Sequence, residues 1–218
     1  MAFNYKDTSK EHLDEHINRL VDIMDKIELN KVTVLTGGNA LGKSLIRKQL
    51  PFRISDKLEK LGIKHDIKHC VTSTSMQART ESRPDWGALS SIMHDMPWSS
   101  TSDSTIHALK QLLKDREEKK YFVIDELEIG MSREVAVGTT EYVNKHLPKL
   151  LSTSHGLLVI THSADVVRTL KHDVFINIEG LTEEKWLNRE VEPVDPEDIE
   201  KWAGKLFRRV EDRSKKVN

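Results

Sequence analysis

Residues 37–44 read GGNALGKS, which fits the pattern G-x-x-x-x-G-K-[ST]. Glycines permit positive φ, so successive N–H groups can point at phosphate oxygens, and a following helix adds the positive end of its dipole. In this pattern Lys43 is expected to reach the β- and γ-phosphates, and the Ser44 hydroxyl to ligate Mg²⁺. The candidate phosphate-binding residues are Gly37, Gly38, Asn39, Ala40, Leu41, Gly42, Lys43 and Ser44. Motors, GTPases and kinases share such a loop, so it does not by itself define the reaction.

Two apolar runs further along the chain also end in polar residues. YFVID (121–125) ends at Asp125 and is followed by Glu126, and GLLVIT (156–161) is followed by His162. After a phosphate-binding loop, Asp125 is expected to hold Mg²⁺ through its water shell, and Glu126 to polarise a water for attack on the γ-phosphate. His162 could sense or stabilise that phosphate. The simpler interpretations are an acidic end to one strand and a structural histidine at the end of the other.

The hydrophobic spacing predicts the elements that must position these residues. Strands alternate with helices, which favours an α/β fold of the P-loop NTPase type: a mainly parallel sheet flanked by helices in three layers. Ligands of such sheets bind at the carboxyl ends of the strands, where all three polar groups fall. The expected strands are 31–36, 67–72, 121–125, 156–161 and 173–179; the expected helices are 8–27, 44–62 (disturbed by Pro51), 105–120, 133–153, 163–170 and 195–213, with loops and a short helix at 89–93 between residues 73 and 104.

Composition restricts the class of protein. The chain has 218 residues, enough for one well-buried α/β domain, and its formal net charge of −1 gives no support to nucleic-acid binding, although a local patch stays possible. One cysteine fits a reducing cytoplasm, no apolar run approaches the roughly 20 residues of a membrane span, and the first residues are too polar for a signal peptide. We expect an N-terminal helix in residues 1–30, an ATPase core in 31–181 and a C-terminal helical tail in 182–218.

Taken together, the segments GGNALGKS, FVIDE and VITHS resemble the ABC-type ATPases, a superfamily that includes transporter motors, chromosome-organising heads and stand-alone phage or defence ATPases. Asn39 stands where that family commonly has asparagine. The resemblance covers about residues 31–179. It implies that Asp125 and Glu126 form the second acidic motif with its catalytic glutamate, and that His162 is the switch histidine.

The resemblance also implies roles for residues in less specific segments. Gln77 lies where the family has a glutamine that touches Mg²⁺ and the attacking water, so the implied metal ligands are Ser44, Asp125 and Gln77. Ser100 and Asp103, in SSTSDST, occupy the place of the nucleotide-binding signature, although Thr101 and Ser102 replace its glycines. Ser132 stands where the family has the aspartate of its D-loop. The alternative for SSTSDST is a cap for the helix expected after it.

Members of this family sandwich two MgATP molecules between two subunits. The resemblance therefore implies ATP and Mg²⁺ as cofactors, ATP hydrolysis, and a homodimer formed through the ATP site. Because no apolar run in the sequence is long enough to span a membrane, a motor of this kind would act on a separate protein. We therefore expect the energy of ATP hydrolysis to act on a separate effector protein. A nuclease or nucleic-acid-processing partner in a phage or anti-phage system is one such partner.

Two other functions stay open from the sequence. A nucleotide or small-molecule kinase would share the loop and use a lid in residues 73–104, with Arg79 and Arg83 as acceptor-binding residues; the Asp-Glu pair and His162 favour water as the acceptor instead. A nucleotide-gated binding module with little turnover would explain the departures in the signature and at Ser132. The released product and the effect of Glu126→Gln distinguish these alternatives.

Overall fold

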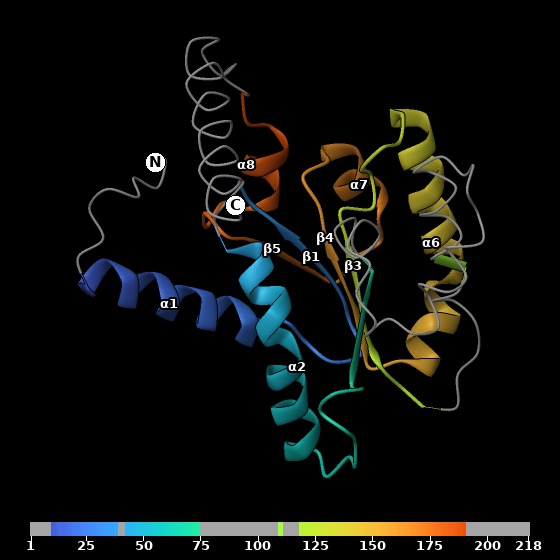
Figure 1. Ribbon diagram of the computed structural model, residues 1–218. Helices are drawn as coiled ribbons and strands as arrows, with labels where there is room; N and C mark the ends of the chain where they lie inside the picture. Colours follow the sequence, from blue (N-terminus) through green and yellow to red (C-terminus); the bar gives the residue numbers. More distant parts are fainter. Residues whose placement is uncertain (1–9, 39–41, 75–108, 111–117, 191–218) are drawn as a thin grey trace, which may run out of the picture. The chain divides into compact units, whose positions relative to one another are not determined.

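The computed structural model of the chain describes residues 10–38, 42–74, 109–110 and 118–190 (Figure 1). The chain divides into two compact units, residues 1–187 and 188–218, and every element below belongs to the first. The short helix at 89–93, most of the helix at 105–120 and the tail helix at 195–213 lie outside the described residues. No helix in the described ranges is long and apolar enough to cross a membrane.

The centre of the fold is a five-stranded sheet in which every pair of neighbouring strands is parallel. Its order is β2-β3-β4-β1-β5, with β1 (Val32–Thr36), β2 (Val71–Thr74), β3 (Tyr121–Asp125), β4 (Gly156–Ile160) and β5 (Val174–Asn177). This confirms the predicted α/β fold with a parallel sheet. Because all strands run the same way, their carboxyl ends meet at one edge of the sheet.

Helices cover both faces of the sheet, as Figure 1 shows. Helices α1 (Lys10–Asp25) and α2 (Lys43–Lys60) pack on one face, and α6 (Arg133–Thr153), α7 (Ala164–Thr169) and α8 (Glu183–Leu187) pack on the other. Side chains alternate along each strand, so Tyr121 and Val123 join the first cluster and Phe122 and Ile124 the second. The resulting α/β/α arrangement has the three layers that the sequence predicted.

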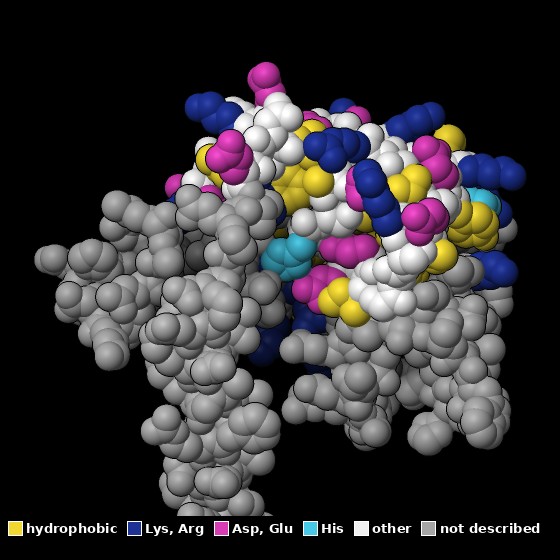
Figure 2. All heavy atoms as spheres, turned by 90° about the horizontal axis from the view of Figure 1, so that it is seen from above, with side chains coloured by type: hydrophobic (Ala, Val, Ile, Leu, Met, Phe, Trp, Pro, Cys, Tyr) yellow, Lys and Arg dark blue, Asp and Glu magenta, His cyan; other side chains and the backbone are white. Residues whose placement is uncertain are grey.

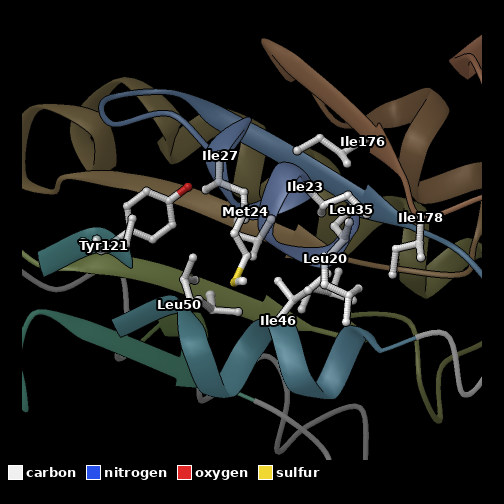
Figure 3. Close-up of a cluster of buried hydrophobic side chains, with 14 of the residues drawn as sticks. Leu20, Ile23, Met24, Ile27, Leu35, Ile46, Leu50, Tyr121, Ile176 and Ile178 are labelled. Carbon is white, nitrogen blue, oxygen red and sulfur yellow. The ribbon is translucent and has the colours of Figure 1, made fainter. Parts of the chain in front are cut away.

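Helix α2 is held on the sheet by a stripe of buried residues (Figure 3). Its side chains Ile46, Leu50, Ile54 and Leu58 recur every fourth residue and are fully buried against α1 and the sheet. The helix continues through Pro51, which stands within the same packed segment. Because this stripe is packed against the core, α2 holds the backbone of its first turn, at Lys43 and Ser44, in a fixed place.

The second strand begins later than the sequence predicted. We expected a strand over 67–72, whereas β2 begins at Val71. Asp66 accounts for the difference, because its side chain accepts a hydrogen bond from the backbone N–H of Lys68 (2.9 Å) and its carbonyl accepts one from His69 (2.9 Å). These bonds form a turn that competes locally with strand pairing and leaves Ile67 exposed.

Two glycines give opposite predictions for stability. At Gly156, which opens β4 with φ 131°, an added Cβ would lie 2.7 Å from the Tyr121 ring and 3.1 Å from the Lys31 carbonyl oxygen. We expect Gly156→Ala to lower the free energy of unfolding by roughly 2–4 kcal/mol. The control is Gly138→Ala inside α6, where an added Cβ meets nothing within 4 Å, and it should stabilise the chain by about 0.5–1 kcal/mol. Urea unfolding of both variants measures this, and equal effects would contradict the packing described.

Candidate functional site

The glycine-rich loop (residues 37–44) connects the buried strand β1 to the first turn of α2. Gly37 has φ 151°, and a Cβ there would approach the Cβ of Ile178 to 3.0 Å, so this position accepts little but glycine. Gly42 caps α2 with φ 104°. Asn39, Ala40 and Leu41 lie outside the described residues. The described ends of the loop thus have the left-handed backbone and close packing that a phosphate cradle requires.

Lys43 lies folded back over this loop. Its ammonium donates hydrogen bonds to the carbonyl oxygens of Gly37 (2.8 Å) and Gly38 (2.9 Å). Burial lowers the pKa of Lys43, and the carboxylates of Glu126 and Asp125 act against this by favouring the charged form. The ammonium is therefore held beside Gly37 and Gly38, where the carboxylates of Glu126 and Asp125 act on it.

Asp125 ends β3 and forms an ion pair with Arg47, one helical turn after Lys43 on α2. The Arg47 guanidinium lies 3.2 Å from the Asp125 carboxylate, and both side chains are less than a fifth exposed. Burial raises the pKa of Asp125 to about 6, although Arg47 lowers it, and the neighbouring charge of Glu126 adds to the increase. Asp125 is thus a poorly solvated carboxylate that gains from a cationic partner.

Glu126 and His162 approach one another from the ends of adjacent strands. Nε2 of His162 lies 3.6 Å from Oε1 of Glu126, and each side chain is about a third exposed. Glu126 has φ 56°, an uncommon backbone conformation for a residue with a side chain, and its N–H donates to the Ile160 carbonyl (2.8 Å). Such local strain is frequent where a side chain is aimed at a functional site. The pair could polarise a water molecule placed between them and the loop.

Glu128 is a residue of this region that the sequence reasoning missed. One of its oxygens, Oε1, accepts hydrogen bonds from the Thr161 hydroxyl (2.8 Å) and from the backbone N–H of His162 (2.9 Å). The only signal in the sequence is the second glutamate of DELE, two residues after Glu126. Arg47 was missed as well, although its spacing of four residues from Lys43 places both on one face of α2.

The loop is also fixed from the other side, by the end of β5. The Asn177 side chain donates to the Thr36 hydroxyl (3.1 Å), and its carbonyl oxygen accepts from the N–H groups of Glu179 and Leu181 (3.0 Å each). The Ile178 N–H donates to the Thr36 carbonyl (3.0 Å). These bonds hold Thr36, the residue directly before the glycine-rich loop, against the end of β5.

The structure therefore brings together many of the residues that the sequence singled out. Gly37, Gly38, Gly42, Lys43, Ser44, Asp125, Glu126 and His162 all lie at or just beyond the carboxyl ends of β1, β3 and β4. Figure 2 views the molecule from above, and a histidine there lies against acidic side chains. Gln77, Ser100 and Asp103 lie outside the described residues, as do Arg79 and Arg83, so their predicted roles stay predictions. The three-part division of the chain also stays a prediction.

The described donor set suits a magnesium ion better than a metal bound by protein alone. Within the ranges that the structure describes, no three His, Cys, Asp or Glu side chains form a group that could hold a metal ion. Mg²⁺ usually keeps several waters and takes one or two protein oxygens together with phosphate oxygens. A half-buried Asp125 and the exposed hydroxyl-bearing Ser44 fit that requirement.

Comparisons with known proteins identify no family for this chain. No family model matches it, and no curated protein matches its sequence. Among solved structures, the ABC transporter cassette MJ0796, a bacterial protein solved as a dimer, has a TM-score of 0.40 and 11% identity over 70% of this chain and 83% of that one. PCH-2 of C. elegans has a TM-score of 0.36 and 14% identity over 77% of this chain and 42% of its own. Drosophila ORC bound to AT-rich DNA and Cdc6 has a TM-score of 0.29 and 12% identity, and the match covers 82% of this chain and 30% of that one.

The raised pKa of Asp125 predicts a pH dependence of stability. Between its ordinary value of 3.8 and about 6, the folded chain binds more protons at Asp125 than the unfolded chain does, so stability falls as the pH rises through this range. Asp125→Asn removes this effect. We expect wild type to lose on the order of 2–3 kcal/mol of unfolding free energy relative to Asp125→Asn between pH 3.5 and 7.

Urea unfolding of both proteins at each pH measures the difference. Asp22→Asn, at an exposed aspartate of α1, controls for the loss of one negative charge. Parallel pH curves for wild type and Asp125→Asn would show that burial does not disfavour the charged carboxylate.

Proposed function

We propose that this chain binds ATP with Mg²⁺ at the carboxyl edge of its sheet and hydrolyses the nucleotide. The observation that carries the proposal is the convergence of Lys43, Asp125, Glu126 and His162, which come from the ends of three adjacent strands. A cation on a glycine-rich loop, a half-buried carboxylate and a carboxylate-histidine pair are groups of the kind that phosphoryl transfer to water uses. Lys43 is the lysine of the pattern G-x-x-x-x-G-K-[ST], which is typical of phosphate-binding loops.

Binding would exchange the partners that the two cations of α2 have in the structure. Lys43 would leave the carbonyl oxygens of Gly37 and Gly38 and donate instead to the β- and γ-phosphate oxygens. Ser44 and Asp125 would hold Mg²⁺, and Asp125 would give up its ion pair with Arg47 in doing so. The metal, when bound, neutralises charge that develops on the phosphate oxygens. Gln77 is proposed as a further ligand on the resemblance alone.

Glu126 and His162 would act on the attacking water. With Nε2 of His162 lying 3.6 Å from Oε1 of Glu126, a water hydrogen-bonded to Glu126 stays within reach of the imidazole. Glu126 would polarise this water, and His162 would donate a hydrogen bond to the γ-phosphate. Water is then the acceptor, which distinguishes the reaction from that of a kinase.

We further propose that two copies of the chain associate around the nucleotide and act on a separate partner. Both Glu126 and His162 are about a third exposed, so a γ-phosphate beside them would be solvated on one side. A second subunit could exclude that water and supply donors, for which Ser100 and Asp103 are candidates from the resemblance. ATP binding and association would then be linked, and hydrolysis would separate the pair.

The proposal predicts a distinct behaviour for Glu126→Gln. The variant keeps the size of the side chain but not the carboxylate, so we expect it to bind MgATP, to release phosphate at least about 100-fold more slowly than wild type, and to sediment as a dimer in MgATP. Wild type should form that dimer only transiently. The measurement is phosphate release followed by sedimentation with and without MgATP.

Two controls complete the comparison. Lys43→Ala should lose nucleotide binding and with it both phosphate release and dimerisation, and Glu184→Gln, at an exposed glutamate of α8, should match wild type. A phosphorylated acceptor with little released phosphate would establish a kinase instead. Equal dimerisation of wild type and Glu126→Gln without phosphate release would establish a binding module.

A further inference from the structure

Glu128 holds the turn that follows β4 through a single oxygen. Oε1 accepts from the Thr161 hydroxyl and from the His162 N–H, at 2.8 and 2.9 Å, and the Thr161 hydroxyl oxygen accepts in turn from the Ser163 N–H at 3.0 Å. The Ser163 hydroxyl then caps α7 by accepting from the Val166 N–H at 3.3 Å. One carboxylate oxygen therefore begins a chain of hydrogen bonds that fixes residues 161–163 and the start of α7.

The second oxygen of Glu128 shows that this arrangement is not optimal for stability. Oε2 is inaccessible to solvent and has no hydrogen-bond partner among the described residues. Placing a carboxylate with one unsatisfied oxygen in such a position is unfavourable, and an apolar side chain of the same length would avoid the penalty. A polar group kept in this state calls for an explanation other than packing.

The position of Glu128 in the chain supplies that explanation. Glu126 and Glu128 belong to the same short segment after β3, and both contact His162: Glu126 through the imidazole and Glu128 through the backbone N–H. The segment is itself tied to β4 by the hydrogen bond from the Glu126 N–H to the Ile160 carbonyl. Glu128 thus fixes the backbone of His162 relative to the residue that the imidazole faces.

We propose that Glu128 is a positioning residue, which sets the place of His162 against Glu126 by accepting the His162 N–H and the Thr161 hydroxyl. The inference assigns Glu128 no contact with nucleotide or water. Its predicted effect on the rate of ATP hydrolysis rests on the proposed function. It concerns the acceptor oxygen and not the negative charge. A variant that keeps the acceptor should therefore keep the rate, and one that removes it should lose the rate while still binding ATP.

The test compares Glu128→Met with Glu128→Gln. Methionine fills a similar volume without an acceptor, and glutamine keeps an Oε1 that can accept both bonds. We expect Glu128→Met to lower kcat roughly 10- to 100-fold, because small displacements of reacting groups have effects of this size, with the Kd for MgATP changed less than about threefold. Glu128→Gln should stay within about threefold of wild type, and Glu184→Met serves as the matched control on an exposed carboxylate.

A measurement that does not depend on activity tests the anchor itself, meaning the two hydrogen bonds that Glu128 accepts from the Thr161 hydroxyl and the His162 N–H. In chain labelled with ¹⁵N-histidine, the backbone amide of His162, assigned by its loss in His162→Gln, should shift upfield and exchange faster in Glu128→Met but not in Glu128→Gln. Should Glu128→Met fail to fold, Thr161→Val removes the hydroxyl half of the anchor at similar volume and should give a smaller effect in the same direction.

A double-mutant cycle decides whether Glu128 acts through His162. In a His162→Ala background, Glu128→Met should lower kcat less than about threefold further, because the imidazole that it positions is already absent. Additive losses, a full rate in Glu128→Met, or an equal loss in Glu128→Gln would each overturn the proposal. A wild-type chain that releases no phosphate would overturn the proposed function alone, and the His162 amide would still decide the positioning.

Discussion

The register of three adjacent parallel strands is the constraint on which the site depends. Ile160 of β4 pairs with Leu35 of β1 on one side and with Asp125 of β3 on the other, so these residues form one row across the sheet. The residues that follow these three along the chain, Thr36, Thr161 and Glu126, come just beyond that row. Hydrogen bonds continue the row, because the Ile160 carbonyl accepts from the residue after Asp125, and the Leu35 carbonyl accepts from the residue after Ile160. A slip of one residue would turn the site's side chains to the opposite face.

The charged side chains at this edge of the sheet contact other groups of the same chain. Lys43 contacts carbonyl oxygens of the glycine-rich loop and Arg47 pairs with Asp125, while Glu126 and Glu128 contact the turn after β4. A bound metal-nucleotide complex would bring both a cation and phosphate oxygens, so it could replace the partners of Asp125 and of Lys43 together. Under the proposed function, this exchange links binding of the phosphates to binding of the metal.

The sequence predicts well what depends on local patterns. The glycine-rich loop, the buried strands and the polar residues at their ends all follow from residue types and periodicity, and parallel pairing then brings them to one edge. The predicted start of β2 was wrong because the Asp66 side chain accepts a hydrogen bond within a local turn, and this turn competes with strand hydrogen bonds. The role of Glu128 could not be read from the sequence, because it depends on the approach of two loops whose bonded residues are 34 positions apart.

The most direct test of the central claim is hydrolysis of ATP in H₂¹⁸O, with the products resolved by ³¹P NMR. If Glu126 and His162 activate water at the carboxyl edge of the sheet, the label should appear in the released phosphate and not in ADP, and Glu126→Gln should release no labelled phosphate on the same timescale. Label in ADP, transfer of the γ-phosphoryl group to another acceptor, or undiminished release by Glu126→Gln would contradict the account.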